Sequence, residues 1–366
     1  MKCKGLLALG LLGALGCNTA QKAAPAAADP SNAWPAGWDA LCPASGAAPP
    51  VVLRVADVQV RFEPSGAAVW NNRVLVAGDK QAHVWWWIPG TSAVVEDPAW
   101  NFALSGVPGP NACCSSAPGD WGSELKRKKA AETCGDHQVA LGTPVPWFKA
   151  EGATSNAQGL FVTGNMGFGC EENGSVLQLP GPGAVPTAVP GTQRQGLLDA
   201  LGAKDLRVEG VAVTPDSKHF YVAVRSRDDV LSHQVVRVGA SGRTVIAVEP
   251  PAPAPEIQMG LSDITVLRDG RVAVTVSREE DVAGKRVVAG ELWVTTAPPR
   301  DDATSWPTQR VAVFADHKPE GLVQLSPTCV AVLFDDDETY KAQQRAATPS
   351  PQWDSSAAFV GYVRLP

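Results

Sequence analysis

A short motif returns five times along this chain and constrains its fold more than any other feature. Each copy is an acidic or hydroxyl residue that opens an apolar run, and the copies begin at Ser65, Glu151, Glu209, Ser262 and Glu320. A second run rich in β-branched residues follows roughly ten residues later, after turn residues such as Asn71-Asn72 and Pro215-Asp216. Internal repeats of this length indicate an array of similar structural units.

A third and a fourth run complete most of these units. The third runs cover 83–88, 175–179, 235–238, 291–295 and 359–365, and the fourth runs cover 93–95, 185–189, 244–248 and 310–314. The fifth unit has no fourth run before Pro366, whereas an unassigned apolar run at 51–60 precedes the first unit. We therefore expect this N-terminal strand to complete the last unit, which closes a ring and hides its edges. The sequence predicts an all-β protein, a β-propeller of four-stranded blades over residues 51–366.

The spacing of the repeats predicts the number of blades. The five starting residues are separated by 86, 58, 53 and 58 residues, so the first interval is too long for one unit. We expect five blades, with the excess at about 98–148 as an inserted Cys-containing loop, and the alternative is that this segment forms a sixth blade. A β-sandwich would not explain a spare first strand matched to a missing last one. The 35 Gly and 31 Pro also indicate many turns and disfavour a helical bundle.

Three consecutive tryptophans, Trp85 to Trp87, lie in the third run of the first unit. Because side chains alternate along a strand, Trp86 is expected on one face and Trp85 and Trp87 on the other. Neighbouring blades cover both faces of a propeller blade, so packing between blades explains the run better than a platform for sugars.

The first residues predict export and a lipid anchor. Lys2 and Lys4 precede an apolar segment at 5–16, which is typical of a signal peptide and too short to span a bilayer. The sequence Ala14-Leu15-Gly16-Cys17 resembles the lipobox of bacterial lipoproteins, which implies cleavage after residue 16 and lipidation of Cys17. An ordinary secretory signal is the alternative. Residues 17–50 then form an Ala/Pro-rich tether, and Asn18 favours the outer membrane of the cell envelope.

Cysteine usage agrees with an oxidising compartment outside the cytoplasm. Six cysteines remain besides Cys3 and Cys17, at positions 42, 113, 114, 134, 170 and 329. We expect a disulfide within the 98–148 segment, from Cys113 or Cys114 to Cys134. Cys329 lies in an apolar run and is expected to be a buried free thiol.

The charge of the chain excludes one class of partner. The formal net charge is −6, so no phosphate-neutralising surface for nucleic acid is expected. The predicted partners are therefore a membrane, reached through the lipid, and an unknown protein or small molecule.

In a propeller, equivalent positions of different blades meet around one axis, so the repeated polar residues predict a ligand site at one mouth of the channel. The candidates from the motif are Ser65, Glu151, Glu209, Ser262 with its neighbour Asp263, and Glu320. The candidates from the ends of the second runs are Asp79, Asn165, Arg225 and Asp335. Carboxylates this close raise one another's pKa unless a cation lies among them.

Three interpretations of this mouth stay open. Glu151, Glu209, Asp263 and Glu320 could hold a hard cation such as Ca²⁺, the mouth could bind a cationic or polyhydroxylated ligand, or the acidic residues could be structural. In the structural interpretation, the glycine of each Glu-Gly pair serves a tight turn.

The Glu209-Gly210 opening with its Pro215-Asp216 turn resembles the phytase-like and esterase-like β-propellers of bacteria. This resemblance covers residues 51–366 and implies a propeller with an acidic channel mouth and, in some relatives, metal-dependent phosphoester hydrolysis. No catalytic residue can be assigned from it. We expect a lipid-anchored extracytoplasmic binding scaffold, with a metal-dependent phosphoesterase or esterase as the alternative.

Overall fold

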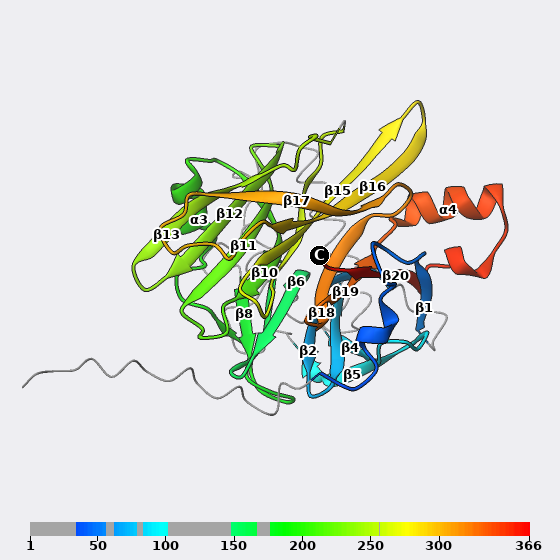
Figure 1. Cartoon of the computed structure of the whole chain (residues 1–366), viewed down its shortest axis with the longest axis horizontal. Helices are drawn as coiled ribbons and strands as arrows, with labels where there is room; N and C mark the ends of the chain where they lie inside the picture. The colour runs from blue at the N-terminus through cyan, green and yellow to red at the C-terminus, as the bar shows by residue number, and fades with distance from the viewer. Residues whose placement is uncertain (1–33, 56–61, 79–82, 102–147, 167–175, 256) are drawn as a thin grey trace, which may run out of the picture. The chain divides into compact units, whose positions relative to one another are not determined.

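The computed structural model describes residues 34–55, 62–78, 83–101, 148–166, 176–255 and 257–366. Within them the strands form consecutive antiparallel groups of four, each running outward from its first strand (Figure 1). Blade 1 contains β2 (Pro64–Trp70), β3 (Arg73–Gly78), β4 (His83–Trp87) and β5 (Ala93–Asn101). Blade 2 contains β6 (Phe148–Asn156), β7 (Gly159–Met166), β8 (Val176–Leu179) and β9 (Thr187–Ala188).

The remaining blades follow the same order. Blade 3 contains β10 (Leu206–Val213), β11 (His219–Arg227), β12 (Val230–Gly239) and β13 (Gly242–Glu249). Blade 4 contains β14 (Gly260–Val266), β15 (Val272–Val282), β16 (Lys285–Thr295) and β17 (Ser305–Phe314). Blade 5 contains β18 (Pro319–Ser326), β19 (Cys329–Phe334), β20 (Ala357–Arg364) and, as its outermost strand, β1 (Val51–Val55).

The ring closes between the two ends of the described chain, as the spare first strand predicted. Strand β1 pairs antiparallel with β20, in a register that places Val51 opposite Val360 and Arg54 opposite Ala357. The first strands also contact one another in sequence, from β2 through β6, β10 and β14 to β18, and β18 contacts β2. This closed circuit of inner strands is the β-propeller fold.

Two pairs of blades are also joined at their outer edges. Strand β1 runs parallel to β5, and β13 runs parallel to β17, which unites blade 5 with blade 1 and blade 3 with blade 4. These contacts cover edges that would otherwise expose unpaired backbone groups.

The hydrophobic core lies between successive blades. Trp85 and Trp87 are 1% and 0% exposed and pack in one cluster with residues of blade 5, whereas Trp86 packs against blade 2. The predicted alternation of the three tryptophans is therefore confirmed. Because neighbours cover both faces of a blade, strands such as β18 and β19 are buried along their whole length.

The antiparallel order gives the propeller two unlike faces. The face where the first strand of each blade turns into the second is called the turn face, and it has short turns such as Asn71-Asn72, with φ of 47° and 62°. The opposite face, where the first strands begin, is called the mouth face. Its connections are longer: α4 (Glu338–Ala347) and the single-turn helix η4 (Pro351–Trp353) lie between β19 and β20, and α4 projects from the body (Figure 1).

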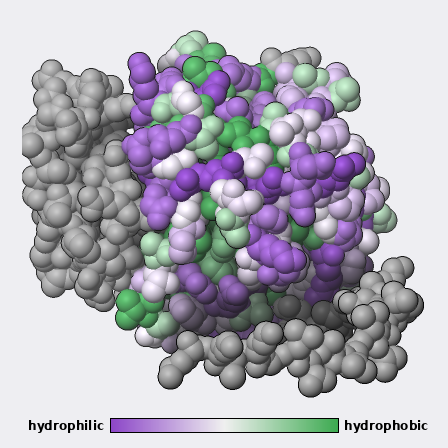
Figure 2. All heavy atoms as spheres, turned by 90° about the vertical axis from the view of Figure 1, so that its left-hand side faces the viewer, coloured by the Kyte–Doolittle hydropathy of each residue, from purple (hydrophilic) through white to green (hydrophobic). Residues whose placement is uncertain are grey.

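The described helices are short. Besides α4, helix α3 (Arg194–Leu201) packs its leucines against blade 3. Neither has the length and apolarity required to cross a bilayer. Figure 2 shows hydrophilic and hydrophobic residues interspersed on the face of the molecule that carries β13 and α3.

The disulfide differs from the one expected. Cys42 bonds to Cys329, with their Cα atoms 5.7 Å apart, so Cys329 is not a free thiol and that prediction was wrong. The partners are 287 residues apart in sequence and meet only because ring closure brings the segment before β1 onto blade 5. The cysteines expected to pair within 98–148 lie outside the described residues.

Candidate functional site

The five motif residues occupy one repeated irregularity of the backbone. In every first strand the pairing register shifts by one residue at the motif, which is a β-bulge. The bulged residues are Ser65, Glu151, Glu209, Ser262 and Glu320, and each is at most 3% exposed. The sequence repeat therefore marks a repeated structural feature on the mouth side of the ring.

The residue after each motif position lies where neighbouring first strands come closest. A Cβ added to Gly152 would lie 2.6 Å from the Cα of Gly210, and one added to Gly66 would lie 2.3 Å from the backbone nitrogen of Ala153. Neither glycine has a positive φ. The Glu-Gly pairs therefore serve the close approach of strands, and the interpretation of their glycines as turn residues was wrong.

Asp263 takes the place of this glycine in blade 4. Its Oδ1 accepts a hydrogen bond of 2.8 Å from the Ile264 backbone, and its Oδ2 accepts one of 2.7 Å from the backbone of Leu322 on β18. Its side chain is completely buried, and burial raises the pKa of Asp263 well above its usual value. The carboxylate thus joins blade 4 to blade 5, and both of its oxygens are engaged.

One charged cluster connects blades 3, 4 and 5 at the mouth face. Arg225, at the end of β11, donates from Nη1 to Ser277 Oγ over 2.7 Å and to Glu320 Oε1 over 3.3 Å. Ser277, on β15, donates to the same Glu320 oxygen over 3.2 Å. Arg225 is 6% exposed and Glu320 is 3% exposed, so this ion pair is buried. The structure thus brings together Arg225 and Glu320 with Ser277, which ends the second run of the fourth unit as Arg225 ends that of the third.

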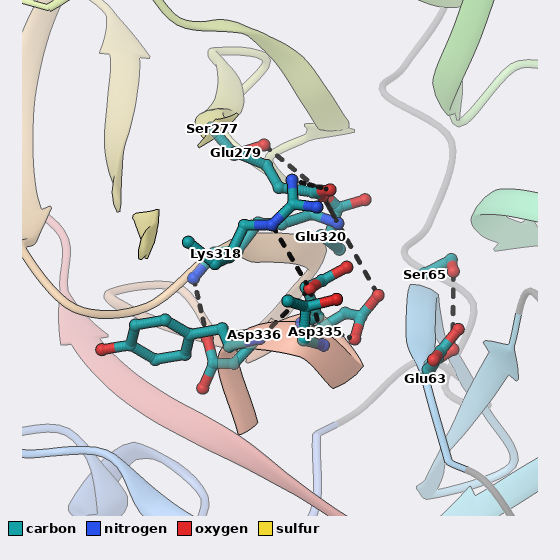
Figure 3. Close-up of polar contacts among 12 residues, drawn as sticks. Glu63, Ser65, Ser277, Glu279, Lys318, Glu320, Asp335 and Asp336 are labelled. Carbon is teal, nitrogen blue, oxygen red and sulfur yellow. Dashed lines mark hydrogen bonds and ion pairs between the residues drawn. The ribbon is translucent and has the colours of Figure 1, made fainter. Parts of the chain in front are cut away.

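Lys318 is the second cation of this cluster. Its Nζ lies 2.9 Å from Glu279 Oε2, 3.4 Å from Glu320 Oε1 and 3.7 Å from Asp335 Oδ2. Figure 3 shows Lys318 near Glu279, Glu320 and Asp335, whereas Glu63 and Ser65 lie apart from them, at the start of β2. The positive charge that the converging carboxylates require is therefore supplied by side chains of the protein.

Two carboxylates of the cluster have pKa values displaced in opposite directions. Burial raises the pKa of Glu320 to about 7, although Lys318 and Arg225 oppose that shift. Burial also acts to raise the pKa of Glu279, but the charge and hydrogen bond of Lys318, with Arg225 and Arg286, lower it to about 2. Glu279 is therefore ionised at neutral pH, and Glu320 titrates there.

Stability should therefore depend on pH through Glu320. Its pKa of about 7 exceeds the ordinary 4.5, so the folded state binds this proton more tightly. The free energy of unfolding should fall as pH rises from 4.5 to 7, by at most about 1.4 kcal/mol per pH unit from this group. Glu320→Gln keeps an acceptor for Arg225 and cannot titrate, so urea unfolding at several pH values should show this slope lost.

Glu279→Gln is the matched control. The contribution of Glu279 is present above its ordinary pKa of 4.5 and is lost as pH falls towards about 2. Glu279→Gln should be less stable than the wild type at neutral pH. Its free energy of unfolding should still fall between pH 4.5 and 7 as that of the wild type does. An unchanged slope in Glu320→Gln would contradict the assignment of that titration to Glu320.

Arg207 is an exposed cation beside the buried carboxylates of the mouth. Its Nη2 lies 2.9 Å from Glu209 Oε1, and its side chain is 56% exposed whereas that of Glu209 is 2% exposed. Glu209 raises the pKa of Arg207 above its ordinary value, burial opposes this shift, and Glu151, Glu320 and Glu279 add to it. The guanidinium therefore stands in the field of several carboxylates and still reaches solvent.

Sequence reasoning did not select Arg207, Lys318 or Glu279. The sequence did contain a signal for Arg207 and Lys318, because each lies two residues before a motif residue. Arg207 is on the same strand as Glu209, and Lys318 directly precedes the strand of Glu320. Residues two apart on a strand point to the same side. For Glu279, two residues beyond Ser277, the same argument applies.

The other predicted site residues differ in the contacts that the structure describes for them. Ser262 Oγ donates to Thr275 Oγ1 over 3.2 Å, and Ser65 Oγ lies 3.5 Å from the carbonyl oxygen of Glu63, so both hydroxyls have contacts within the protein. Glu151 is buried at the mouth. Asp79 lies outside the described residues, and of Asn165 the structure describes only the backbone, which pairs with Lys149.

No metal-holding group of three or more His, Cys, Asp or Glu side chains occurs in the part of the chain that the structure describes. Of the four residues expected to hold Ca²⁺, Asp263 binds two backbone N–H groups, Glu209 pairs with Arg207, and Glu320 pairs with Arg225. The calcium site stays a prediction.

Comparisons with known proteins show remote likeness only. No protein-family model and no curated protein sequence matches the chain. Similar solved structures include the PQQ-bound aldose sugar dehydrogenase of Streptomyces coelicolor, at 12% identity, with 87% of this chain and 100% of that chain covered and a TM-score of 0.37. The α-L-arabinofuranosidase of Podospora anserina in complex with cellotriose is also similar, at 10% identity. The match covers 89% of this chain and 99% of that chain, with a TM-score of 0.41.

A third similar structure is described as a β-propeller. It is the Cps50 (Swd1) β-propeller domain of Myceliophteria thermophila, at 9% identity, with 83% of this chain and 84% of that chain covered and a TM-score of 0.31. With identities and TM-scores this low, these likenesses support no function for this chain. The fold assignment rests on the strand pairing described above.

Proposed function

We propose that the chain is a lipid-anchored extracytoplasmic β-propeller of five blades whose mouth face binds a ligand or a protein. The observation that carries the binding function is the pairing of exposed Arg207 with buried Glu209, over 2.9 Å, within a cluster that contains charges of both signs. A guanidinium has five N–H donors, so an ion pair with one carboxylate oxygen leaves others for an incoming group.

The chemistry of the mouth favours a ligand rich in hydroxyl groups. A hydroxyl both donates and accepts hydrogen bonds, so it satisfies a carboxylate and a guanidinium at the same time. Arg207 is a donor that reaches solvent, whereas Glu209, Glu320 and Asp335 are 2%, 3% and 7% exposed, so a ligand meets the guanidinium first and these carboxylates only at their edges. A purely cationic ligand would have to compete with Arg225 and Lys318, which already neutralise these carboxylates.

Oligosaccharides are the probes for this proposal. A neutral chito-oligosaccharide and a uronic-acid oligosaccharide should each be titrated into the purified protein, with the melting temperature Tm as the readout. We expect at least one to raise Tm by about 1–2 °C per kcal/mol of linked binding energy in a domain of this size. Arg207→Ala should abolish that rise, whereas Lys218→Ala, a 73% exposed lysine on the turn face, should keep it. No rise with either sugar would contradict a hydroxyl-rich ligand.

The anchor is the second part of the proposal. The lipobox-like sequence ending at Cys17 supports lipidation, and three acyl chains would hold the protein firmly at a membrane. Asn18 favours the outer membrane as the location. A disulfide between Cys42 and Cys329 agrees with an oxidising compartment, where such bonds persist.

One observation favours the alternative, a phosphoesterase or esterase. Ser277 donates to Glu320, whose pKa is about 7, and a serine beside a carboxylate poised near neutrality resembles an activated nucleophile. However, Ser277 is 0% exposed, so an ester has no access to its hydroxyl in this arrangement. The geometry therefore favours binding over hydrolysis.

Hydrolysis assays should separate the two functions. We expect the release of nitrophenol from p-nitrophenyl acetate, and from p-nitrophenyl phosphate with Ca²⁺, to be equal for the wild type and Ser277→Ala. Glu209→Gln tests the calcium site in the same assay. The Tm measured in Ca²⁺ should also be the same for this variant as for the wild type. Turnover that either substitution abolishes would establish the enzyme function instead.

A further inference from the structure

The described residues 34–43 of the N-terminal segment are fastened to the turn face of the propeller. Cys42 is bonded to Cys329, the first residue of β19, and Asp39 accepts hydrogen bonds from Ser326, the last residue of β18, and from Thr328 in the turn that follows. Arg364, at the end of β20, donates to Asp39 Oδ1 over 2.8 Å and also to backbone carbonyls of the same segment. All these partners lie on the turn face.

The first described residues are held at the same face by blades 4 and 1. The guanidinium of Arg268, just beyond β14, stacks over the ring of Trp34 with 3.9 Å to its centroid. Trp38 is 5% exposed, and a Cβ on Gly90 would lie 3.1 Å from Leu41. The chain therefore enters the propeller at the turn face, at a point fixed by three blades and one covalent bond.

The mouth cluster lies at the other end of the same strands. On β18, Glu320 is near the start and Ser326 is the last residue, and β19 runs from Cys329 to Phe334, just before Asp335. Eight strand residues span about 25 Å. The long connections share the mouth face: α4 follows Asp335, and the described ends of the 102–147 connection, Asn101 and Phe148, lie there too.

We infer that the anchored protein presents its mouth face away from the membrane and its turn face towards it. This inference rests on the lipidation of Cys17 in the proposed function. Residues 17–33 are 17 in number, and a coil of that length has an end-to-end distance on the order of 25 Å. For the mouth to face the bilayer, a linker of this length would have to cover the depth of the propeller, about 25 Å along a strand, in addition to the distance from the entry point to the rim.

This orientation narrows the class of partner. A ligand of Arg207 arrives from the aqueous side of the envelope and not from the lipid headgroups to which the protein is anchored. The turn face serves as the support, and its turns are short and polar, as at Asp216 to Lys218. The mouth face, which carries α4, is then the surface exposed to the aqueous side.

Energy transfer to the membrane tests the orientation. An azide-bearing amino acid is placed at Lys218 on the turn face or at Lys285 in the β15–β16 turn on the mouth face, both exposed, and labelled with a donor dye. The lipidated full chain is reconstituted in vesicles of phosphatidylethanolamine and phosphatidylglycerol that contain an acceptor lipid. We expect the transfer efficiency from position 218 to be at least twice that from position 285.

The outcomes separate the two proposals. If the wild type does not sediment with the vesicles any better than Cys17→Ala, the lipid anchor is overturned, and the orientation with it. If the wild type sediments with the vesicles but transfer from 285 equals or exceeds that from 218, the anchor stands and the orientation is overturned. Stronger transfer from 218, lost in Cys17→Ala, supports both.

Discussion

Replacing Cys42 and Cys329 together by alanine is expected to lower the free energy of unfolding by about 4 kcal/mol. The bond joins residues 287 apart in sequence, so it removes a large part of the conformational entropy of the unfolded chain. It also fastens the entering segment beside the β1–β20 pair that closes the ring. Urea unfolding under oxidising conditions should show a lower midpoint for the double variant.

Reduction provides the control for this experiment. A reducing agent should lower the midpoint of the wild type by nearly the same amount, because it opens the same bond. The double variant in reducing agent reports any contribution from the other cysteines, which lie outside the described residues. If the free energy of unfolding of the wild type exceeds that of the double variant by less than about 1 kcal/mol, the disulfide does not stabilise the closure of the ring.

Lys318→Met is expected to cost about 3–5 kcal/mol, the loss typical when one member of a buried ion pair is removed. Methionine keeps much of the volume but leaves Glu279, Glu320 and Asp335 without the ammonium that lies 2.9 to 3.7 Å from them. Burial acts against the charge of Lys318, but Glu320, Asp335 and Glu279 hold its pKa well above the usual value, so it is charged throughout the accessible pH range. Urea unfolding at neutral pH measures the loss.

Two comparisons make this result specific. Lys285→Met removes an exposed lysine from blade 4 on the same mouth face and should change stability by less than about 0.5 kcal/mol. The loss in Lys318→Met should be smaller under mildly acidic conditions, where the uncompensated carboxylates take up protons. Equal effects of the two substitutions would show that Lys318 does not stabilise the cluster.

The repeat was sufficient to predict the strand order and the closure of the ring. Each blade is formed by neighbouring segments of sequence, so local alternation and turn residues such as Asn71-Asn72 define it. The five motif residues were found for the same reason, since each occupies the same bulge on a first strand. The alternation of Trp85, Trp86 and Trp87 followed from strand geometry alone.

The partners of these residues could not be predicted in the same way. The repeat places Arg225 and Glu320 at one mouth, but their ion pair and the hydroxyl of Ser277 between them join three blades at separations of 52 and 43 residues, and no local pattern indicates such a pairing. The same holds for the disulfide, which pairs Cys42 with a cysteine that its apolar surroundings suggested would be free. Contacts of this kind depend on how the blades are placed around the ring.

The order of residues by itself determined that this chain forms β-strands in repeated groups of four, that a strand from one end completes the group at the other, and where the polar positions recur. The reason is that hydrophobic periodicity and turn chemistry act over a few residues. Only the tertiary structure decided that Arg225 and Lys318 neutralise the buried carboxylates, that Asp263 replaces a glycine between two blades, and that the entering segment is bonded to the face opposite the mouth. Charge pairing and covalent crosslinking act between atoms brought together by the ring, and their energies depend on burial that no single strand provides.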